Sequence, residues 1–501
     1  MISRPALLRQ IIWLWLFCLL ALRFVSLYDT VFIVDEPLFQ LKLDEHIAQG
    51  TFPLSSFRGS SIPLPYGAGA LWFYAIPRLF SWSPYGLIFF HILAVTLGAF
   101  LFLKTIHKKF GEEPARWSGL LMASSPLLFF FSRHPWDNTL LFSVAAVLLW
   151  CLVQLEEDGM EYRYHAVMGL AVGYALNIHL MFGPVALALG LTLIFRAWKM
   201  HGPSAKSFWL PLLLFGGCAL LVLIPYLWEA FRIMQLEHPL EHTKYTKRWG
   251  DGRNLWWLLQ RSVIFSSIWG SRIYLENLHP YFLAFVGQPF AFLFRNDLFG
   301  WFAKIAAIAV AVSYPVQFLR GRAKFDSLRL FASLSLASMI LVLHYLNIPT
   351  APHYFHSVWW LVFLGVAVSL TKLNGIGKKF FVTTIVLTAL VNTAFILSSL
   401  AFFHINKGGR NFQFSVSVGE QLRAIREICV EANARIPKEA RVNLEKVWVL
   451  GPSFTYIAAH MPECRGVTFS AHRELTNPNF VLTHPGDSDT KADIVINWIS
   501  P

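Results

Sequence analysis

Residues 84–106 read PYGLIFFHILAVTLGAFLFLKTI, an apolar run with a single charged residue, Lys104, near its end. A helix of about 20 such residues spans the hydrocarbon core of a bilayer. Similar runs recur along most of the chain. Of its 501 residues 55% are hydrophobic and only 14% are charged, whereas a soluble domain carries about 25% charged residues. The sequence therefore predicts a polytopic membrane protein, and it excludes a disordered chain and an ordinary cytosolic enzyme.

The apolar runs define the predicted membrane spans. A short run at 68–80 carries Pro77 and Arg78 near its end, so we predict that it is interfacial or re-entrant. Full spans are predicted at approximately 11–28, 84–106, 117–132, 137–155, 165–181, 183–197, 208–228, 297–319, 329–348, 353–371 and 379–403. The expected fold class is an all-α polytopic membrane protein with about 11–13 transmembrane helices.

Charged residues give the predicted orientation. The net charge is +13, and most basic residues lie in short loops between apolar runs, as they do in cytoplasmic loops. This placement indicates topology signals and contact with anionic lipid, and not binding to nucleic acid. The acidic loop from Gln154 to His165 is an exception. The N-terminus is then cytoplasmic, and the segments 29–83, 229–296 and 404–501 face outward.

The last hundred residues differ in character from the rest. Gly419–Asn433 has apolar residues at helical spacing, while Val447–Leu450 and Asp493–Trp498 are typical of short strands. We therefore predict a transmembrane domain over 1–403 and a small α/β extracytoplasmic domain over 404–501. Cys429 and Cys464 lie in the second domain and could pair if it faces an oxidising compartment.

Two adjacent acids follow the first span, in Val34-Asp35-Glu36-Pro37. Proline suits the first turn of a helix and glycine suits its end, which predicts a helix from this motif to Gly50. Acids at the start of a helix are also favoured by its dipole, so a simple cap is the alternative to a functional pair. Beside hydrocarbon, however, an unneeded charge is costly. The apolar positions at spacing i, i+4, i+8 predict that this helix lies on the membrane surface: Phe39, Leu43 and Ile47.

This arrangement resembles the GT-C superfamily of membrane glycosyltransferases, and within it the protein mannosyltransferase and aminoarabinose transferase branch. The resemblance covers the layout of the whole chain. It is strongest at Asp35-Glu36. Weaker matches are the stretch Ser132-Arg133-His134-Pro135-Trp136-Asp137-Asn138 and the stretch Pro352-His353-Tyr354, where relatives often carry Arg-Tyr.

The resemblance implies an enzyme that takes a sugar from a polyprenyl-phosphate donor on the outer face of a bacterial inner membrane. Asp35 would be the general base of an inverting single displacement. Glu36 would assist, hold a metal or position the loop. The acceptor would be a hydroxyl of a lipid, a glycan or a protein, and nucleic acid would not be a partner.

Binding of the donor phosphate and sugar requires basic and aromatic residues on the outer side. Each candidate has a simpler interpretation as well: contact with anionic headgroups, snorkelling of arginine, interfacial anchoring of tyrosine, or an ion pair between Arg133 and Asp137. The predicted set is Arg133, Asp137, Lys244, Lys247, Arg248, His353 and Tyr354.

Other chemistries have less support. His238 and His242 have i, i+4 spacing beside Glu241, but Pro239 disfavours a helix there, so no metal ligands are assigned and a divalent cation is left open. No GxxxxGK[ST] loop or dinucleotide fingerprint supports a nucleotide-sugar donor or ATP-driven transport. The alternatives are a transporter or lipid flippase, a polymerase or ligase of lipid-linked glycans, and a non-catalytic scaffold.

Overall fold

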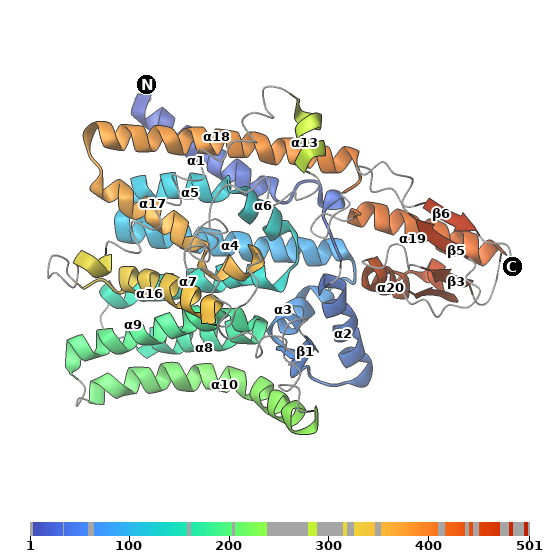
Figure 1. Ribbon diagram of the computed structural model, residues 1–501, viewed down its shortest axis with the longest axis horizontal. Helices are drawn as coiled ribbons and strands as arrows, with labels where there is room; N and C mark the ends of the chain where they lie inside the picture. Colours follow the sequence, from blue (N-terminus) through green and yellow to red (C-terminus); the bar gives the residue numbers. More distant parts are fainter. Residues whose placement is uncertain are drawn as a thin grey trace.

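The computed structural model describes residues 4–33, 35–58, 65–157, 162–202, 206–237, 279–287, 314–317, 325–345, 352–408, 416–435, 440–443, 450–470, 480–483 and 495–498. Within these residues the protein is mostly helical. Long helices lie side by side in a bundle, and a smaller group of helices and strands lies at one end of it (Figure 1).

Six helical segments in the described part of the chain are long and apolar enough to cross a membrane. They are formed by α4 (Pro84–Phe110), α7 (Asp137–Glu157), η2 (Leu180–Phe182) with α9 (Gly183–His201), α10 (Lys206–Glu237), η6 (Pro352–Val358) with α17 (Trp360–Lys372), and α18 (Gly375–Ile405). Shorter apolar helices accompany them: α1 (Arg4–Leu22), α8 (Tyr162–Ile178), α13 (His279–Val286) and α16 (Ser327–Tyr345). The predicted span at 297–319 lies almost wholly outside the described residues, so the full count of 11–13 stays a prediction.

The predicted single span at 117–132 is wrong. The structure has two helices there, α5 (Glu112–Ala123) and α6 (Pro126–Arg133). Pro126 has no backbone N–H to continue the first helix, and it occupies the first turn of the second. Ser125 caps that helix, because its hydroxyl accepts a hydrogen bond from the Leu128 N–H over 3.4 Å. Proline therefore breaks an apolar run that hydropathy alone presents as continuous.

Ion pairs gather at one end of the bundle and account for the acidic exception in the charge pattern. Lys108 lies 2.6 Å from Glu157, and Lys109 pairs with Glu156. These acids end α7, and the lysines end α4. The acidic loop therefore balances basic residues of a neighbouring helix at the end that the sequence predicts to be cytoplasmic.

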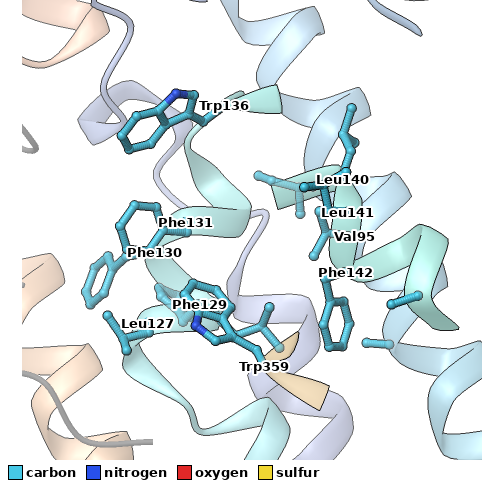
Figure 2. Packing of buried hydrophobic residues seen from close by; sticks show 14 of the residues in the cluster. Val95, Leu127, Phe129, Phe130, Phe131, Trp136, Leu140, Leu141, Phe142 and Trp359 are labelled. Atoms are coloured by element: carbon cyan, nitrogen blue, oxygen red, sulfur yellow. The ribbon is translucent and has the colours of Figure 1, made fainter. Parts of the chain in front are cut away.

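Buried aromatic residues pack the centre of the bundle. Phe129, Phe130 and Phe131 of α6 lie close to Trp359, while Val95 and Phe142 come from α4 and α7 (Figure 2). The T-shaped pair of Phe129 and Phe130 has ring centroids 5.1 Å apart. Such packing of large rings fixes the short helix α6, and with it the turn that joins α6 to α7.

The outer segment after α1 begins with η1 (Leu27–Asp29) and forms α2 (Asp35–Gln49), the antiparallel strands β1 (Ser55–Arg58) and β2 (Pro65–Gly67), and α3 (Gly69–Arg78). The predicted helix is confirmed, and Gly50 follows it with φ of +62°. The prediction that its apolar residues lie on the membrane surface is wrong for two of the three. Phe39 and Leu43 are buried inside the protein, and only Ile47, 59% exposed, is free to meet lipid. The Phe39 ring packs on Tyr74 of α3, because α3 folds back against α2.

The C-terminal residues form α19 (Val418–Arg435), α20 (Gly451–Ala459), η8 (Pro462–Cys464) and a sheet ordered β4 (Val467–Ser470), β3 (Ala440–Asn443), β5 (Phe480–Thr483), β6 (Val495–Trp498). β3 is parallel to β4 and β5, and β6 is antiparallel to β5. The predicted helix and the last predicted strand are confirmed as α19 and β6. Most of the strand predicted at Val447–Leu450 lies outside the described residues. Cys429 and Cys464 form a disulfide.

The C-terminal elements are docked on the outer segment. The Val418 N–H donates to the Thr30 carbonyl over 2.9 Å. Near the end of α2, Asp44 accepts a hydrogen bond of 2.9 Å from Arg78 and lies 3.3 Å from His460 of the C-terminal part. The His460 ring also stacks on Trp82, with centroids 5.5 Å apart. These contacts fix α2 from outside the bundle.

Candidate active site

Asp35 and Glu36 occupy the first turn of α2, where the unpaired N–H groups of the helix favour negative charge. Glu36 is almost fully buried, and its Oε2 accepts a hydrogen bond of 3.1 Å from the Ile33 N–H. Asp35 is partly exposed. The two adjacent acids therefore have different surroundings, although the sequence presents them as a pair.

His134, in the turn between α6 and α7, holds Glu36. Its Nδ1 lies 3.0 Å from Glu36 Oε1. Burial raises the pKa of the Glu36 carboxyl well above its usual range, and the neighbouring Asp35 charge raises it further. Burial also lowers the pKa of His134 to about 3. Both shifts favour the uncharged forms of Glu36 and His134, which lie within hydrogen-bond distance of each other.

Trp136 holds Asp35 from the same turn. Its indole N–H donates to Asp35 Oδ2 over 3.1 Å. Burial raises the pKa of Asp35 to about 6, although the indole hydrogen bond opposes the shift. The second carboxylate oxygen, Oδ1, receives no hydrogen bond from the described residues. Asp35 is therefore mostly ionised at neutral pH and has one oxygen available to accept a proton.

The turn itself is fixed by Tyr74 of α3. The Tyr74 hydroxyl donates to the Pro135 carbonyl over 2.6 Å and lies 3.1 Å from Nδ1 of His91 on α4. Because the hydroxyl proton is used on the carbonyl, the hydroxyl oxygen accepts from a neutral His91 protonated at Nδ1. Tyr74 and His91 are both fully buried. Sequence reasoning gave these two residues no role in the site, since their contacts join helices that are distant in the sequence.

Asp137 begins α7 beside this turn and is 3% exposed. Its Oδ1 accepts the backbone N–H of Asn138 over 2.8 Å. Its charge also contributes to the raised pKa of Glu36, which places it near the acid pair. Of the two predicted donor-binding residues whose side chains the structure describes, Arg133 and Asp137, it is Asp137 that lies near the acids.

Arg133 has a different environment from the one predicted. It is 4% exposed, and its guanidinium donates to main-chain carbonyls at the end of α1. The Arg23 carbonyl is 3.1 Å away, the Ser26 carbonyl is 2.7 Å away, and the carbonyls of Leu22 and Val25 complete the set. These carbonyls lie at and just after the last residue of α1, so this arginine holds the chain where α1 ends. That geometry favours a structural role over the predicted contact with phosphate or with Asp137.

Arg23 is a buried cation that sequence reasoning missed. It is 0% exposed, and all three of its guanidinium nitrogens lack a hydrogen-bond partner among the described residues. It continues the buried face of α1 that includes Leu16 and Leu20. The available signal was an arginine inside the apolar run Ile11–Tyr28, where an ionisable residue merits attention.

The structure describes the remaining predicted residues only in part or not at all. Lys244, Lys247 and Arg248 lie outside the described residues, as do His238, Glu241 and His242. His353 and Tyr354 belong to η6, where the backbone is described. No group of three or more His, Cys, Asp or Glu side chains in the described ranges could hold a metal ion. Among the described residues, the oxygens of Glu36 contact the Ile33 N–H and His134, and Asp35 Oδ2 accepts from Trp136.

Residues 68–228 match the family of dolichyl-phosphate-mannose-protein mannosyltransferases. The solved structure of ArnT from Cupriavidus metallidurans in the apo state has 13% sequence identity and a TM-score of 0.53, over 91% of this chain and 84% of that one. ArnT bound to undecaprenyl phosphate has 14% identity and a TM-score of 0.47, over 94% and 92%. No curated protein matches the sequence.

An oligosaccharyltransferase from Archaeoglobus fulgidus, AglB, in complex with an inhibitory peptide and a dolichol-phosphate, has 14% identity and a TM-score of 0.45. It covers 90% of this chain and 64% of that one. The family match includes α3 and the α6–α7 turn, whose His134 and Trp136 contact the acid pair. The fold shared with apo ArnT extends over nearly all of the chain. Residues 68–228 are therefore similar to that mannosyltransferase family, and the chain shares the fold of apo ArnT.

Proposed function

We propose that this chain is an inverting glycosyltransferase that moves a sugar from a polyprenyl-phosphate donor to an acceptor hydroxyl. The observation that carries the proposal is Asp35. It is partly exposed, its pKa is raised to about 6, and one of its oxygens has no partner among the described residues. A general base needs a pKa near the working pH and a lone pair open to the substrate.

The reaction follows from that geometry in one displacement. The acceptor hydroxyl gives its proton to Asp35 Oδ1 while its oxygen attacks the anomeric carbon. The bond from that carbon to the phosphate oxygen breaks, and the phosphate leaves with the electron pair. Attack opposite the leaving group inverts the anomeric configuration. No step requires a metal.

Glu36 has a positioning role in this proposal. Its two oxygens are occupied by the Ile33 N–H and by His134, so it fixes the start of α2 and does not meet substrate. Its raised pKa also favours a neutral carboxyl next to Asp35. Asp137 remains the nearest candidate to bind a sugar hydroxyl of the donor.

The proposal places the site on the extracytoplasmic side of a bacterial inner membrane. The acid pair contacts His134 and Trp136 just before the start of α7, while Glu156 and Glu157 with their lysine partners lie at the other end of that helix. The basic end is typical of the cytoplasmic side. The transmembrane domain would cover 1–403, and 404–501 would lie over the acceptor entrance. The acceptor is a lipid, glycan or protein hydroxyl.

Transfer from a labelled pool of polyprenyl-phosphate sugars tests the proposal. Membranes that contain wild type, Asp35→Asn, Glu45→Gln or no protein would be compared at equal amounts of inserted protein. Glu45 is the matched control, because it is an exposed acid on the same helix that pairs with Lys42 and Gln49. We expect transfer by wild type and Glu45→Gln, with a loss of at least 100-fold in Asp35→Asn.

Three outcomes would contradict the proposal. Full activity of Asp35→Asn would remove Asp35 as the base. Absence of transfer by wild type across a broad donor set would favour the transporter and scaffold readings. A product with retained configuration would replace the single displacement by a double one.

A further inference from the structure

We propose that Trp136 is a positioning residue that fixes Asp35 with Oδ2 turned inward and Oδ1 turned toward the acceptor hydroxyl. This inference rests on the proposed function. It assigns a role to a side chain whose sequence neighbours, Arg133 and Asp137, were the predicted site residues of that stretch. It also explains how two adjacent acids come to perform different tasks.

The indole is suited to this role because it has one donor and no acceptor. Its N–H is directed at Asp35 Oδ2 over 3.1 Å, so it can satisfy one oxygen and leave the other open. A lysine or arginine in the same place would neutralise the carboxylate and lower its basicity much further. A tryptophan orients the base and retains most of its proton affinity.

The indole ring is itself held firmly. Trp136 is 8% exposed. Its ring stacks on Phe131 with centroids 6.0 Å apart and meets the His134 ring edge-on at 5.6 Å. Figure 2 shows Trp136 above the phenylalanines of α6, at the end of the buried aromatic cluster. A ring packed on two sides cannot turn to follow Asp35, so Asp35 must follow the ring.

The short turn between α6 and α7 therefore supplies a different partner to each of the two acids. His134 binds Glu36, and Trp136 binds Asp35. Tyr74 fixes the residue between them through its hydrogen bond to the Pro135 carbonyl. The spacing of the turn directs the first side chain to the buried acid and the second to the partly exposed acid. Loss of Trp136 should affect Asp35 while Glu36 keeps its partner.

The charged and titratable groups around Asp35 determine what the loss would do. Glu36 and Asp137 are acidic, while His134 and Tyr74 are neutral at working pH. Arg133 uses its donors on the carbonyls of α1. The indole N–H is the hydrogen bond from a described side chain that favours the ionised form of Asp35. Its removal should therefore raise the pKa of Asp35.

The pair of variants Trp136→Phe and Trp359→Phe tests the proposal. Both remove a buried indole N–H from the same aromatic cluster. Only the first N–H meets Asp35, because the Trp359 N–H is buried without a hydrogen-bond partner among the described residues. The measurement is kcat/KM for sugar transfer as a function of pH.

In Trp136→Phe we expect the acid limb of the profile to move up by roughly one pH unit, since a hydrogen bond to a charged group contributes about 1.5 kcal/mol. We also expect kcat above that limb to fall about tenfold, because the base is less well oriented. Trp359→Phe should keep the wild-type limb. An unchanged limb in Trp136→Phe, or an equal shift in both variants, would overturn the proposal.

A double-mutant cycle in thermal stability separates this inference from the proposed function. Wild type, Trp136→Phe, Asp35→Ala and the double variant would be melted in detergent at pH 7.5. A coupling between the two sites shows the hydrogen bond whether or not the protein transfers sugar. Coupling without transfer by wild type would refute the proposed function alone. Transfer with no coupling and no shifted limb would refute the role of Trp136 alone.

Discussion

Trp136 donates its indole N–H to Oδ2 of Asp35 over 3.1 Å, although the two residues are 101 positions apart in the sequence. The contact joins the start of α2 to the turn between α6 and α7. A helix-capping aspartate would instead bond to the N–H groups of its own first turn. Asp35 is thus a carboxylate held by a distant side chain, which is the arrangement that a positioned base requires.

The first prediction concerns the pH dependence of activity. As the proposed base, Asp35 must be ionised, and its pKa is raised to about 6. We expect kcat/KM to rise tenfold per pH unit below pH 6 and to level off above it. Initial rates of transfer between pH 4.5 and 8 measure this, with a stability check at each pH. A limb near pH 4 would mean that Asp35 is not shifted or is not the base.

A second prediction links the same group to stability. The pKa of Asp35 is higher in the folded protein than the model-peptide value of 3.8, so folding favours its protonated form. The ionised group therefore destabilises the fold progressively as pH rises from about 4 to 6, and this destabilisation remains at higher pH. Asp35→Asn should be more stable than wild type by about 1 to 3 kcal/mol at pH 7.5.

Below pH 4 that difference should vanish, because both side chains are then neutral. Melting in detergent at several pH values gives the comparison. Equal stabilities of wild type and Asp35→Asn at pH 7.5 would show that burial does not act on Asp35 as described.

The third prediction tests Arg133 as the residue that holds the chain where α1 ends. Arg133→Lys keeps the charge but cannot reach carbonyls as far apart as those of Arg23 and Ser26. We expect a loss of about 2 to 4 kcal/mol in stability, since buried carbonyls lose their donors. Arg232→Lys is the control, because Arg232 forms an exposed pair with Glu229. If Arg133→Lys melts like wild type but loses donor binding, the predicted phosphate role would return.

The fourth prediction concerns the buried cation at the end of α1. The Arg23 guanidinium has no partner among the described residues and is 0% exposed. A buried charge without a partner opposes folding. We expect Arg23→Met to raise the melting temperature, while Arg9→Met, at an exposed position, changes it little. A lower melting temperature for Arg23→Met would indicate that the guanidinium makes a stabilising contact.

The fifth prediction concerns the disulfide. Cys429 and Cys464 are separated by 35 positions, and closing a loop of that size contributes about 2 to 4 kcal/mol. The double variant to alanine should melt at a lower temperature, whereas Cys18→Ala, a free cysteine, should not. Alkylation in whole cells without reductant should leave the two thiols unmodified. Their modification would contradict placement of this part in an oxidising compartment.

Local pattern was enough for the elements that depend on neighbours in the chain. Hydropathy predicted the membrane character and most of the long helices, and Pro37 and Gly50 predicted the bounds of α2. Hydropathy failed at Pro126, where a missing N–H divides an apolar run into two helices. The local pattern also placed the apolar side chains of α2 on the membrane surface. Phe39 is buried instead, because α3 folds back against α2.

The sequence by itself determined that this is a membrane protein and that Asp35 and Glu36 begin a helix beside the first span. It also identified residues 132–138 as a second stretch of interest. Only the tertiary structure decided what those residues do. In the structure Arg133 donates to carbonyls at the end of α1, His134 contacts Glu36, and Trp136 donates to Asp35. Hydropathy and helix signals follow from each residue and its near neighbours, whereas hydrogen bonds across about a hundred residues depend on how the helices pack.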